Sequence, residues 1–505
     1  MNSNLISQVK EIQWVFDVCR KFNWFVENIQ ILANSRNEQQ KYLGFANPYK
    51  NYLILNGEEY YSQNEFENWY SFWDSKFNDD NDFFNKFSQK LFDITSRTIK
   101  YTEELKRTKL DNLNNNELIS IFEDFVNHYI ESFIPAWTRP DNYLEIQLKA
   151  DLRNKYHFED SEIEAIFSEI ATYPELGELS YVDEPLHLLE IATEIKDKKI
   201  NLSKLPEDIN DRIQNHIKKY SWLKGSLFYN FLTFTKKDYL DRLRLMIQKD
   251  SEKEISRINS IRKQKQKDYE AIIRRHHFNS ETLSLIEAVR SFIFLRTHTT
   301  EVSDYLFFIG RSILFKEISN RLDLNLNDIT MLSSIEIVKN LKCRDDSVNE
   351  IIEKREKGFI IIWINGKVET LFGDESLLLI RKIKRILTKD TDKLDNKIIG
   401  RSASRGKVRG IAKVLNTYKD VFKLNKGEIL IASMTTPDYI MAMEKASAFV
   451  TDEGGITCHA AILAREFGVP CIVGTKVATQ IIKDGDNIEV DADNAVVLIL
   501  RKDKH

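Results

Sequence analysis

Apolar side chains recur at helical spacing along most of the first 380 residues. The pattern predicts an amphipathic helix within residues 5–35, helices over 112–134 and 183–195, a long charged helical stretch from 236 to 277, and helices again over 281–322. Residues 66–92 are unusually aromatic, and we interpret them as helix core rather than a ligand box, since aromatic rings mostly fill interiors. The pattern therefore predicts a large, mainly helical body.

Two short β-hairpins are predicted to interrupt the helices. Asn56-Gly57 and Asn365-Gly366 each lie between residues that favour strands. Asn-Gly is a strong signal for a two-residue hairpin turn, because both residues tolerate positive φ. The first hundred residues are accordingly expected to form a helical and hairpin region.

Glycine usage divides the chain near residue 400. Eight of the 17 glycines lie in residues 1–399 and nine in the last 106 residues, whereas all seven tryptophans precede residue 364. Strands are predicted at Lys407–Leu415 and Glu428–Ala432, with two closing strands after Gly474, which indicates a compact α/β domain. The expected order is a helical and hairpin region (1–100), a helical domain (101–380), a charged linker (381–399) and the α/β domain (400–505). The predicted fold class is multidomain α+β.

Composition limits the class of partner. The chain has 73 basic and 77 acidic side chains, a formal net charge of −4, which gives no overall attraction to nucleic acid or anionic membrane. Cys19, Cys343, Cys458 and Cys471 show no CxxC or zinc spacing and indicate a reducing compartment. No signal peptide is recognised and no apolar run reaches spanning length, so a soluble cytoplasmic protein is expected.

The candidate chemistry lies in TDEGGITCHAAILAREFGVPCIVG, residues 451–474. Gly454 and Gly455 allow a tight turn, and Thr457 is predicted to cap the next helix, which places His459 in the first helical turn. Free N–H groups and the positive end of the helix dipole favour an anion there. A neutral imidazole can accept a phosphoryl group and pass it on. A satisfied structural histidine is the alternative that the residues alone leave open.

The string TDEGGITCHAAILARE resembles, without gaps, the phosphohistidine signature of the swivelling domain in phosphoenolpyruvate-utilising enzymes. These enzymes include phosphoenolpyruvate synthases, pyruvate phosphate dikinases and rifampicin phosphotransferases. The resemblance implies that His459 is transiently phosphorylated and that Gly454, Gly455 and Thr457 belong to its phosphate-binding loop. Cys458 stands where the family usually has a small residue such as serine, and we interpret it as a tolerated neighbour rather than a nucleophile. Arg405 stands where the family commonly has proline.

Residues 100–390 are more diffusely similar to the helical substrate-binding part of rifampicin phosphotransferases. No GxxxxGK[ST] loop or ATP-grasp-like glycine-rich segment is recognised in the first 399 residues. The chain also ends about 30 residues past Gly474, which leaves no room for the phosphoenolpyruvate-binding barrel of the synthases. The resemblance therefore implies the layout of a rifampicin phosphotransferase without its ATP-binding part.

These features together predict a phosphotransferase component. His459 is expected to receive phosphate from a separate ATP-grasp protein and to relay it to a small-molecule acceptor bound by the helical domain. Magnesium is expected with ATP on that partner, with no metal held by this chain, and neither nucleic acid nor membrane is an expected partner. Two alternatives remain: a non-catalytic interaction or regulatory protein that retains the swivelling domain, and a self-sufficient small-molecule kinase whose nucleotide site lies unrecognised in residues 1–100.

Basic residues of the helical body are interpreted as structural. Arginines at such spacing can bind a carboxylate or phosphate through their planar fork, but they can equally pair with neighbouring glutamates. We expect the latter for Arg290, Arg296, Arg311 and Arg321, with Glu287, Glu301 and Glu317 as the partners. The basic cluster in residues 260–277 is interpreted as a solvated helix face.

Overall fold

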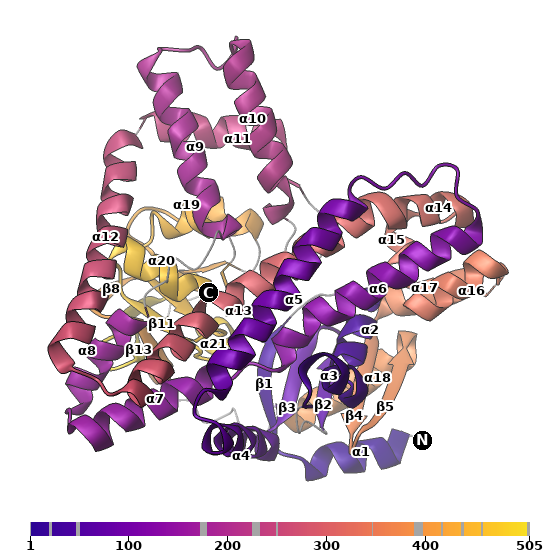
Figure 1. Cartoon of the computed structure of the whole chain (residues 1–505), viewed down its shortest axis with the longest axis horizontal. Helices are drawn as coiled ribbons and strands as arrows, with labels where there is room; N and C mark the ends of the chain where they lie inside the picture. The colour runs from indigo at the N-terminus through magenta and orange to yellow at the C-terminus, as the bar shows by residue number, and fades with distance from the viewer. Residues whose placement is uncertain are drawn as a thin grey trace.

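The computed structural model describes residues 2–19, 23–46, 51–171, 179–224, 233–248, 251–345, 347–387, 397–415, 418–435, 439–455 and 458–501. Over these residues the protein is mainly helical with two β-sheets, so the predicted mixed α+β class is confirmed (Figure 1). The helices are α1 (Asn2–Glu11), α2 (Trp24–Ala33), α3 (Arg36–Leu43), α4 (Gln63–Asp79), α5 (Phe83–Leu105), α6 (Asn115–Trp137), α7 (Asp141–Tyr156), α8 (Asp160–Ile170), α9 (Ser180–Asp197), α10 (Glu207–Tyr220), η1 (Ser221–Lys224), α11 (Lys236–Gln248), α12 (Ser251–His276), α13 (Ser280–Gly310), η2 (Arg311–Phe315), α14 (Lys316–Leu322), α15 (Leu326–Ile329), α16 (Ser334–Lys342), α17 (Val348–Lys357), α18 (Gly373–Leu387), η4 (Tyr418–Lys423), α19 (Ile440–Met443), α20 (His459–Phe467) and α21 (Ala478–Ile481). The strands are β1 (Trp14–Cys19), β2 (Tyr52–Leu55), β3 (Glu58–Ser62), β4 (Phe359–Ile364), β5 (Lys367–Phe372), β6 (Lys397–Ile399), β7 (Arg401–Ser404), β8 (Lys407–Leu415), β9 (Ile429–Ala432), β10 (Ala448–Thr451), β11 (Cys471–Val473), β12 (Asn487–Asp491) and β13 (Val496–Arg501).

The first sheet is antiparallel and has the strand order β1-β3-β2-β4-β5. Both predicted hairpins are confirmed, since Asn56 (φ 51°) and Gly57 (φ 91°) turn between β2 and β3, and Asn365 (φ 52°) and Gly366 (φ 78°) turn between β4 and β5. The pairing of β2 with β4 joins the two hairpins. One sheet therefore unites segments from the two ends of the helical body.

The predicted helix within residues 5–35 is wrong in its middle. The segment forms α1, then strand β1, then α2. Strand β1 pairs antiparallel with β3, with a register shift between Phe16 and Val18. Its sequence, WVFDVC, is rich in aromatic and β-branched residues, which fit a pleated surface. Pairing with β3 thus overrides a spacing that also suits a helix.

Both faces of the first sheet are covered. Leu53, Leu55 and Ile362 pack with Val9 of α1 and Ile383 of α18 on one face. Their neighbours Tyr52, Ile54 and Ile361 pack with Trp24 of α2 and Trp137 of α6 on the other face. Alternate side chains of a strand point to opposite faces, so a strand buried on both sides reads as an unbroken apolar run such as FIIIWI in β4.

The core of the helical body is built around α13, a helix of 31 residues that packs against α5, α6 and α7. Gly310 at its end permits close approach to α6, because a Cβ there would lie 2.2 Å from Cε2 of Phe125. Trp73, Phe84 and Phe87 are buried in this core, which confirms the aromatic segment 66–92 as core. None of the helices in the described part of the chain has the length and apolarity that a bilayer crossing needs.

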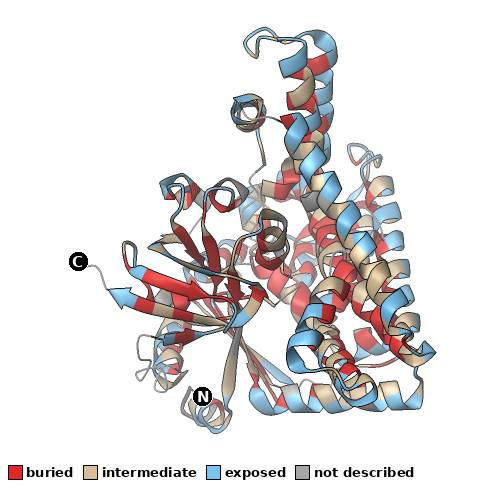
Figure 2. Ribbon diagram, turned by 90° about the vertical axis from the view of Figure 1, so that its left-hand side faces the viewer, coloured by how far each residue is buried: buried red, intermediate tan, exposed pale blue. Residues whose placement is uncertain are grey.

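The second sheet has the order β6-β13-β12-β8-β9-β10-β11-β7. Its centre, β8-β9-β10-β11, is parallel, and the flanking pairs are antiparallel. Phe449 of β10 packs with α20 on one face, whereas Ala448 and Val450 pack with Ala478 of α21 on the other. Figure 2 shows buried residues concentrated in these strands. We call the unit formed by β6 to β13 the carboxy-terminal domain.

The predicted linker, residues 381–399, is too wide at both ends. Residues 381–387 complete α18, and residues 397–399 form β6 at the edge of the second sheet. Residues 388–396 lie outside the described residues. The charges that suggested a linker occupy the exposed face of α18, while Leu379, Ile380 and Ile383 are buried beneath it.

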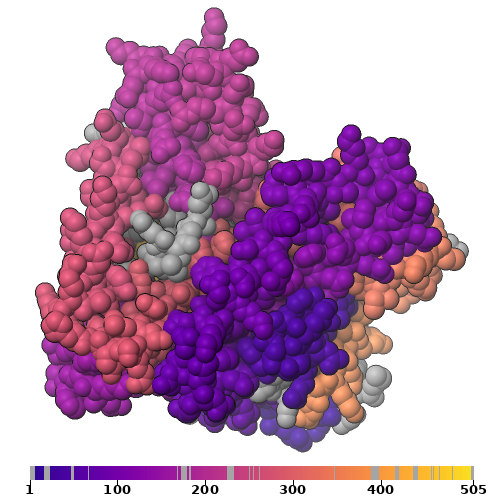
Figure 3. Space-filling model, viewed as in Figure 1, coloured from indigo at the N-terminus to yellow at the C-terminus, as the bar shows by residue number. Residues whose placement is uncertain are grey.

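The carboxy-terminal domain lies behind α8, α12 and α13 in the view of Figure 1, and the helical body covers it from that side (Figure 3). Arg401 of β7 donates a hydrogen bond from Nη1 to Oδ1 of Asn142 on α7, at 3.4 Å. The apolar clusters of the carboxy-terminal domain contain only its own residues. Each part therefore has its own hydrophobic core.

Helices α9, α10 and α11 pack together beside this arrangement around a buried ion network. Arg242 donates two hydrogen bonds to Glu184, at 2.6 and 2.7 Å, and Nε2 of His216 lies 3.0 Å from Oε1 of the same carboxylate. Burial alone would raise the pKa of Glu184, but Arg242 and His216 outweigh it and lower the pKa to about 2. The ordinary value is 4.5, so the stabilisation is present above pH 4.5 and is lost as the pH falls towards 2.

We expect Glu184→Gln to lower the free energy of unfolding at neutral pH by about 3 kcal/mol, because it leaves Arg242 buried without its counter-charge. Urea denaturation followed by circular dichroism measures this. The difference from the wild type should shrink as the pH falls from 4.5 towards 2. Glu350→Gln, which removes an exposed pair with Lys354, is the control and should change little. Equal effects of the two variants would contradict the structural importance of the network.

Candidate functional site

The acidic residues that precede the paired glycines support the loop. Asp452 accepts hydrogen bonds at Oδ1 from Oγ1 of Thr475 (3.0 Å) and from the backbone N–H of Thr479 (3.1 Å). Glu453 accepts one from Oγ of Ser433 at 2.9 Å. Both carboxylates are about 5% exposed. They therefore fasten the end of β10 to the neighbouring loops and are not available to a ligand.

The glycines allow the chain to turn where no other residue fits. Gly454 has φ 103°, and a Cβ there would lie 2.7 Å from Sγ of Cys458. Gly474, with φ 69°, crosses beneath it, since its Cβ would lie 3.0 Å from the carbonyl oxygen of Gly454. A Cβ on Gly455 would lie 3.6 Å from Nη1 of Arg296. Positive φ and crowding thus explain the glycines at positions 454 and 474, whereas the distance at Gly455 is an ordinary van der Waals contact.

Helix α20 begins at His459, so the predicted position of this residue in the first helical turn is confirmed for its backbone. Its side chain is outside the described part of the structure. The N-cap is Cys458 (φ −75°, ψ 167°), one residue after the predicted cap Thr457. Thr457 itself lies outside the described residues, and its contribution to phosphate binding stays a prediction.

Cys458 is half-buried and has no capping hydrogen bond from its side chain. Burial raises the pKa of its thiol, and the Ala461 amide and the charges of Arg296 and Arg465 only partly oppose this. A thiol with a raised pKa is protonated at neutral pH and is a poor nucleophile. The geometry supports the interpretation of Cys458 as a neighbour of the reactive residue.

Arg296 of α13 is a residue of the helical body that contacts the glycine loop. The sequence did not predict this contact. Glu301, one of the glutamates expected to pair with the arginine series, accepts a hydrogen bond from the backbone N–H of Ser180 at 2.9 Å. Nη1 of Arg296 lies 3.7 Å from Oδ2 of Asp141, the first residue of α7. The expected pairing of the arginine series with glutamates is confirmed for Arg321, whose Nε lies 2.8 Å from Oε1 of Glu317. Helical spacing cannot reveal a partner on another helix.

The other end of α20 also meets the helical body through charge. Nε of Arg465 donates to the carbonyl of Ala403 at 2.9 Å. Burial lowers the pKa of Arg465, while the charges of Glu145 on α7 and Glu169 on α8 raise it. Acidic residues of the helical body thus attract a basic residue of the carboxy-terminal domain. A contact made of charges and polar groups is easier to break than a shared apolar core.

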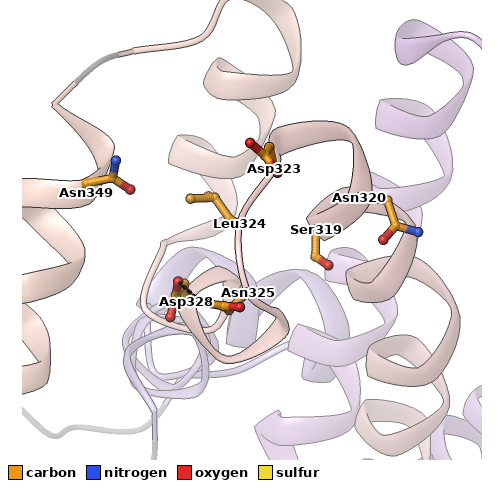
Figure 4. Close-up of a pocket in the computed structure, with 7 residues that line it drawn as sticks. All are labelled: Ser319, Asn320, Asp323, Leu324, Asn325, Asp328 and Asn349. Carbon is orange, nitrogen blue, oxygen red and sulfur yellow. Dashed lines mark hydrogen bonds between the residues drawn. The ribbon is translucent and has the colours of Figure 1, made fainter.

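A hollow of about 450 Å³ lies elsewhere, between α14, α15 and α17 (Figure 4). Its lining is polar, and Nδ2 of Asn325 donates to Oδ2 of Asp328 at 3.2 Å. Figure 1 places these helices at the far end of the molecule from α20. The hollow therefore takes no part in the arrangement around His459.

We expect Gly454→Ala to destabilise the carboxy-terminal domain by about 1–3 kcal/mol, because it adds a clash with Cys458 to the cost of positive φ. Gly427→Ala is the matched control, since Gly427 has φ 90° and nothing within 4 Å of a Cβ. Thermal unfolding of both variants separates the clash from the backbone cost. Equal shifts in melting temperature would show that the close approach to Cys458 is unimportant.

The comparison with protein families matches part of the carboxy-terminal domain. Residues 424–495 match the family described as PEP-utilising enzyme, mobile domain. The chain is 46% identical over 137 residues to a probable phosphoenolpyruvate synthase of Archaeoglobus fulgidus, a match that covers 26% of this chain and 18% of that protein. It is 46% identical over 98 residues to the phosphoenolpyruvate synthase of Pyrococcus furiosus (19% of this chain, 12% of that protein). An uncharacterized phosphotransferase of Bacillus subtilis is 34% identical over 128 residues (25% and 15%). The chain thus matches less than a fifth of the length of these relatives.

Proposed function

We propose that this protein is a phosphotransferase component in which His459 relays a phosphoryl group, because residues 424–495 match the family described as PEP-utilising enzyme, mobile domain. The observation that carries the proposal is the position of His459 at the start of α20, after a glycine loop that faces Arg296 of the helical body. Backbone N–H groups at a helix start offset the charge of a phosphate. A cation on the facing surface offsets it further.

Movement of the carboxy-terminal domain fits its separate core. No apolar cluster of the described residues is shared between the domain and the helical body. Polar and charged contacts join them, including those of Arg401 with Asn142 and of Arg296 with the glycine loop. We propose that the domain swings as a unit about the connection between α18 and β6, so that His459 is charged in one position and discharged in the other.

The phosphoryl donor in this proposal is ATP bound by a separate ATP-grasp protein. Magnesium would accompany the nucleotide on that partner, because phosphoryl transfer relies on neutralised charge and in-line positioning. ATP would yield AMP and inorganic phosphate, with one phosphoryl group passing to His459. The acceptor would be a small molecule held by the helical body, where the glycine loop lies in this structure.

Phosphorylation of the purified chain tests the relay. Incubation with ATP labelled at the β or γ position, together with a candidate ATP-grasp protein, should put acid-labile label on the wild type and none on His459→Ala. Cys458→Ala is the control and should keep the label, because a protonated thiol does not compete for phosphate. Acid lability distinguishes phosphohistidine from phosphoserine.

The same experiment separates the alternatives. Label that appears without any added protein would favour a self-sufficient kinase with its own nucleotide site. Absence of label with every donor and partner would overturn the relay and favour an interaction protein. Label that survives in His459→Ala would assign the phosphate to another residue.

A further inference from the structure

We propose that Asp141 and Arg296 form the acceptor side of the transfer site, and that the group phosphorylated there is a hydroxyl, which Asp141 deprotonates while Arg296 holds the phosphoryl oxygens. This inference rests on the proposed relay through His459 and names the class of acceptor for it. It assigns catalytic roles to two residues of the helical body.

Arg296 lies against the glycine loop that precedes α20. Its Nη1 would be 3.6 Å from a Cβ at Gly455, so the guanidinium rests against the backbone of the glycine loop. Its charge also influences the thiol of Cys458, the residue next to His459. The side chain of Arg296 is about a quarter exposed. A guanidinium in that place can bind two phosphoryl oxygens at once.

Asp141 lies beside Arg296 with one oxygen uncommitted. Its Oδ2 is 3.7 Å from Nη1 of Arg296. Its Oδ1 is buried and, among the residues that the structure describes, accepts no hydrogen bond. A buried carboxylate oxygen without a donor is costly, so native structures that keep one usually supply its donor from a ligand or water. A hydroxyl group of an acceptor would satisfy Oδ1.

The surroundings of Asp141 suit a general base. Burial raises the pKa of Asp141, with a further contribution from Glu145 on the same helix, and the cations Arg296 and Arg139 only partly oppose this. A carboxylate whose pKa is raised binds a proton more strongly than an exposed one. Such a group accepts a proton from a hydroxyl as the new bond to phosphorus forms.

The proposed step is balanced as follows. The acceptor oxygen forms a bond to phosphorus, and the bond from phosphorus to the imidazole nitrogen of His459 breaks. The ring nitrogen keeps the electron pair of that bond, and the hydroxyl proton passes to Asp141. Arg296 neutralises the phosphoryl oxygens during transfer. An ionised carboxylate acceptor needs no base and would be repelled by Asp141, so a neutral hydroxyl is favoured.

The test uses the full chain loaded without any partner. Phosphoramidate, a small donor that transfers its phosphoryl group to histidine and releases ammonia, charges His459. After the excess is removed, the loss of phosphohistidine to concentrated glycerol and water is followed by phosphorus NMR. We expect Asp141→Asn and Arg296→Gln to load like the wild type and to lose phosphate about 100-fold more slowly, the lower end of the effect of a general base.

Asp151→Asn is the matched control, because it removes a carboxylate from the same helix, where Asp151 binds Lys155 at 2.7 Å. It should lose phosphate at the wild-type rate. If all variants load and Asp141→Asn loses its phosphate as fast as the wild type, this inference is overturned and the relay through His459 is not. A slow Arg296→Gln with a fast Asp141→Asn would likewise overturn it, since Asp141 would then only orient the arginine. Failure of the wild type to load would overturn the relay, and this inference with it.

Discussion

The arrangement depends on the hydrogen bonds that Asp452 accepts at the end of β10. This carboxylate binds the hydroxyl of Thr475 and both the amide and the hydroxyl of Thr479. The strand end, the turn after β11 and the start of α21 are thereby held together. Gly454 and Gly474 can then cross at a distance that no side chain would permit. The first turn of α20 is presented from a rigid support, although the loop itself has little apolar packing.

The glycine loop is held firmly within the carboxy-terminal domain, whereas the domain itself is held to the helical body by polar contacts. A relay needs both properties. A residue that visits two sites must keep its local geometry in both, so the loop has to be fixed within its own domain. The domain as a whole has to leave the helical body, which favours polar contacts over a common core. The contact of Arg401 with Asn142 and the charges facing Arg465 fit this requirement. The buried network around Glu184 shows that the body does use strong ion pairs where its parts are to stay together.

The helical body contributes chemistry that its own sequence hides. Arg296 and Asp141 lie on different helices and meet only because α13 passes the start of α7. Asp141 follows Arg139-Pro140, a segment that reads as an ordinary helix start with an acidic first residue. The placement of α7 and α13 turns two common surface residues into a pair that faces the glycine loop.

Local chemistry was readable from the sequence by itself: the two Asn-Gly turns, the aromatic core of α4 and α5, and the start of α20 at His459 all follow from neighbouring residues. Local spacing could not decide between helix and strand for Trp14–Cys19, because that choice depends on pairing with β3. It could not join β2 to β4 either, since the unpaired backbone edge of each hairpin can bind any other strand. The partner of Arg296 was likewise decided by tertiary structure, because an ion pair between helices depends on how they pack and not on the residues beside each charge.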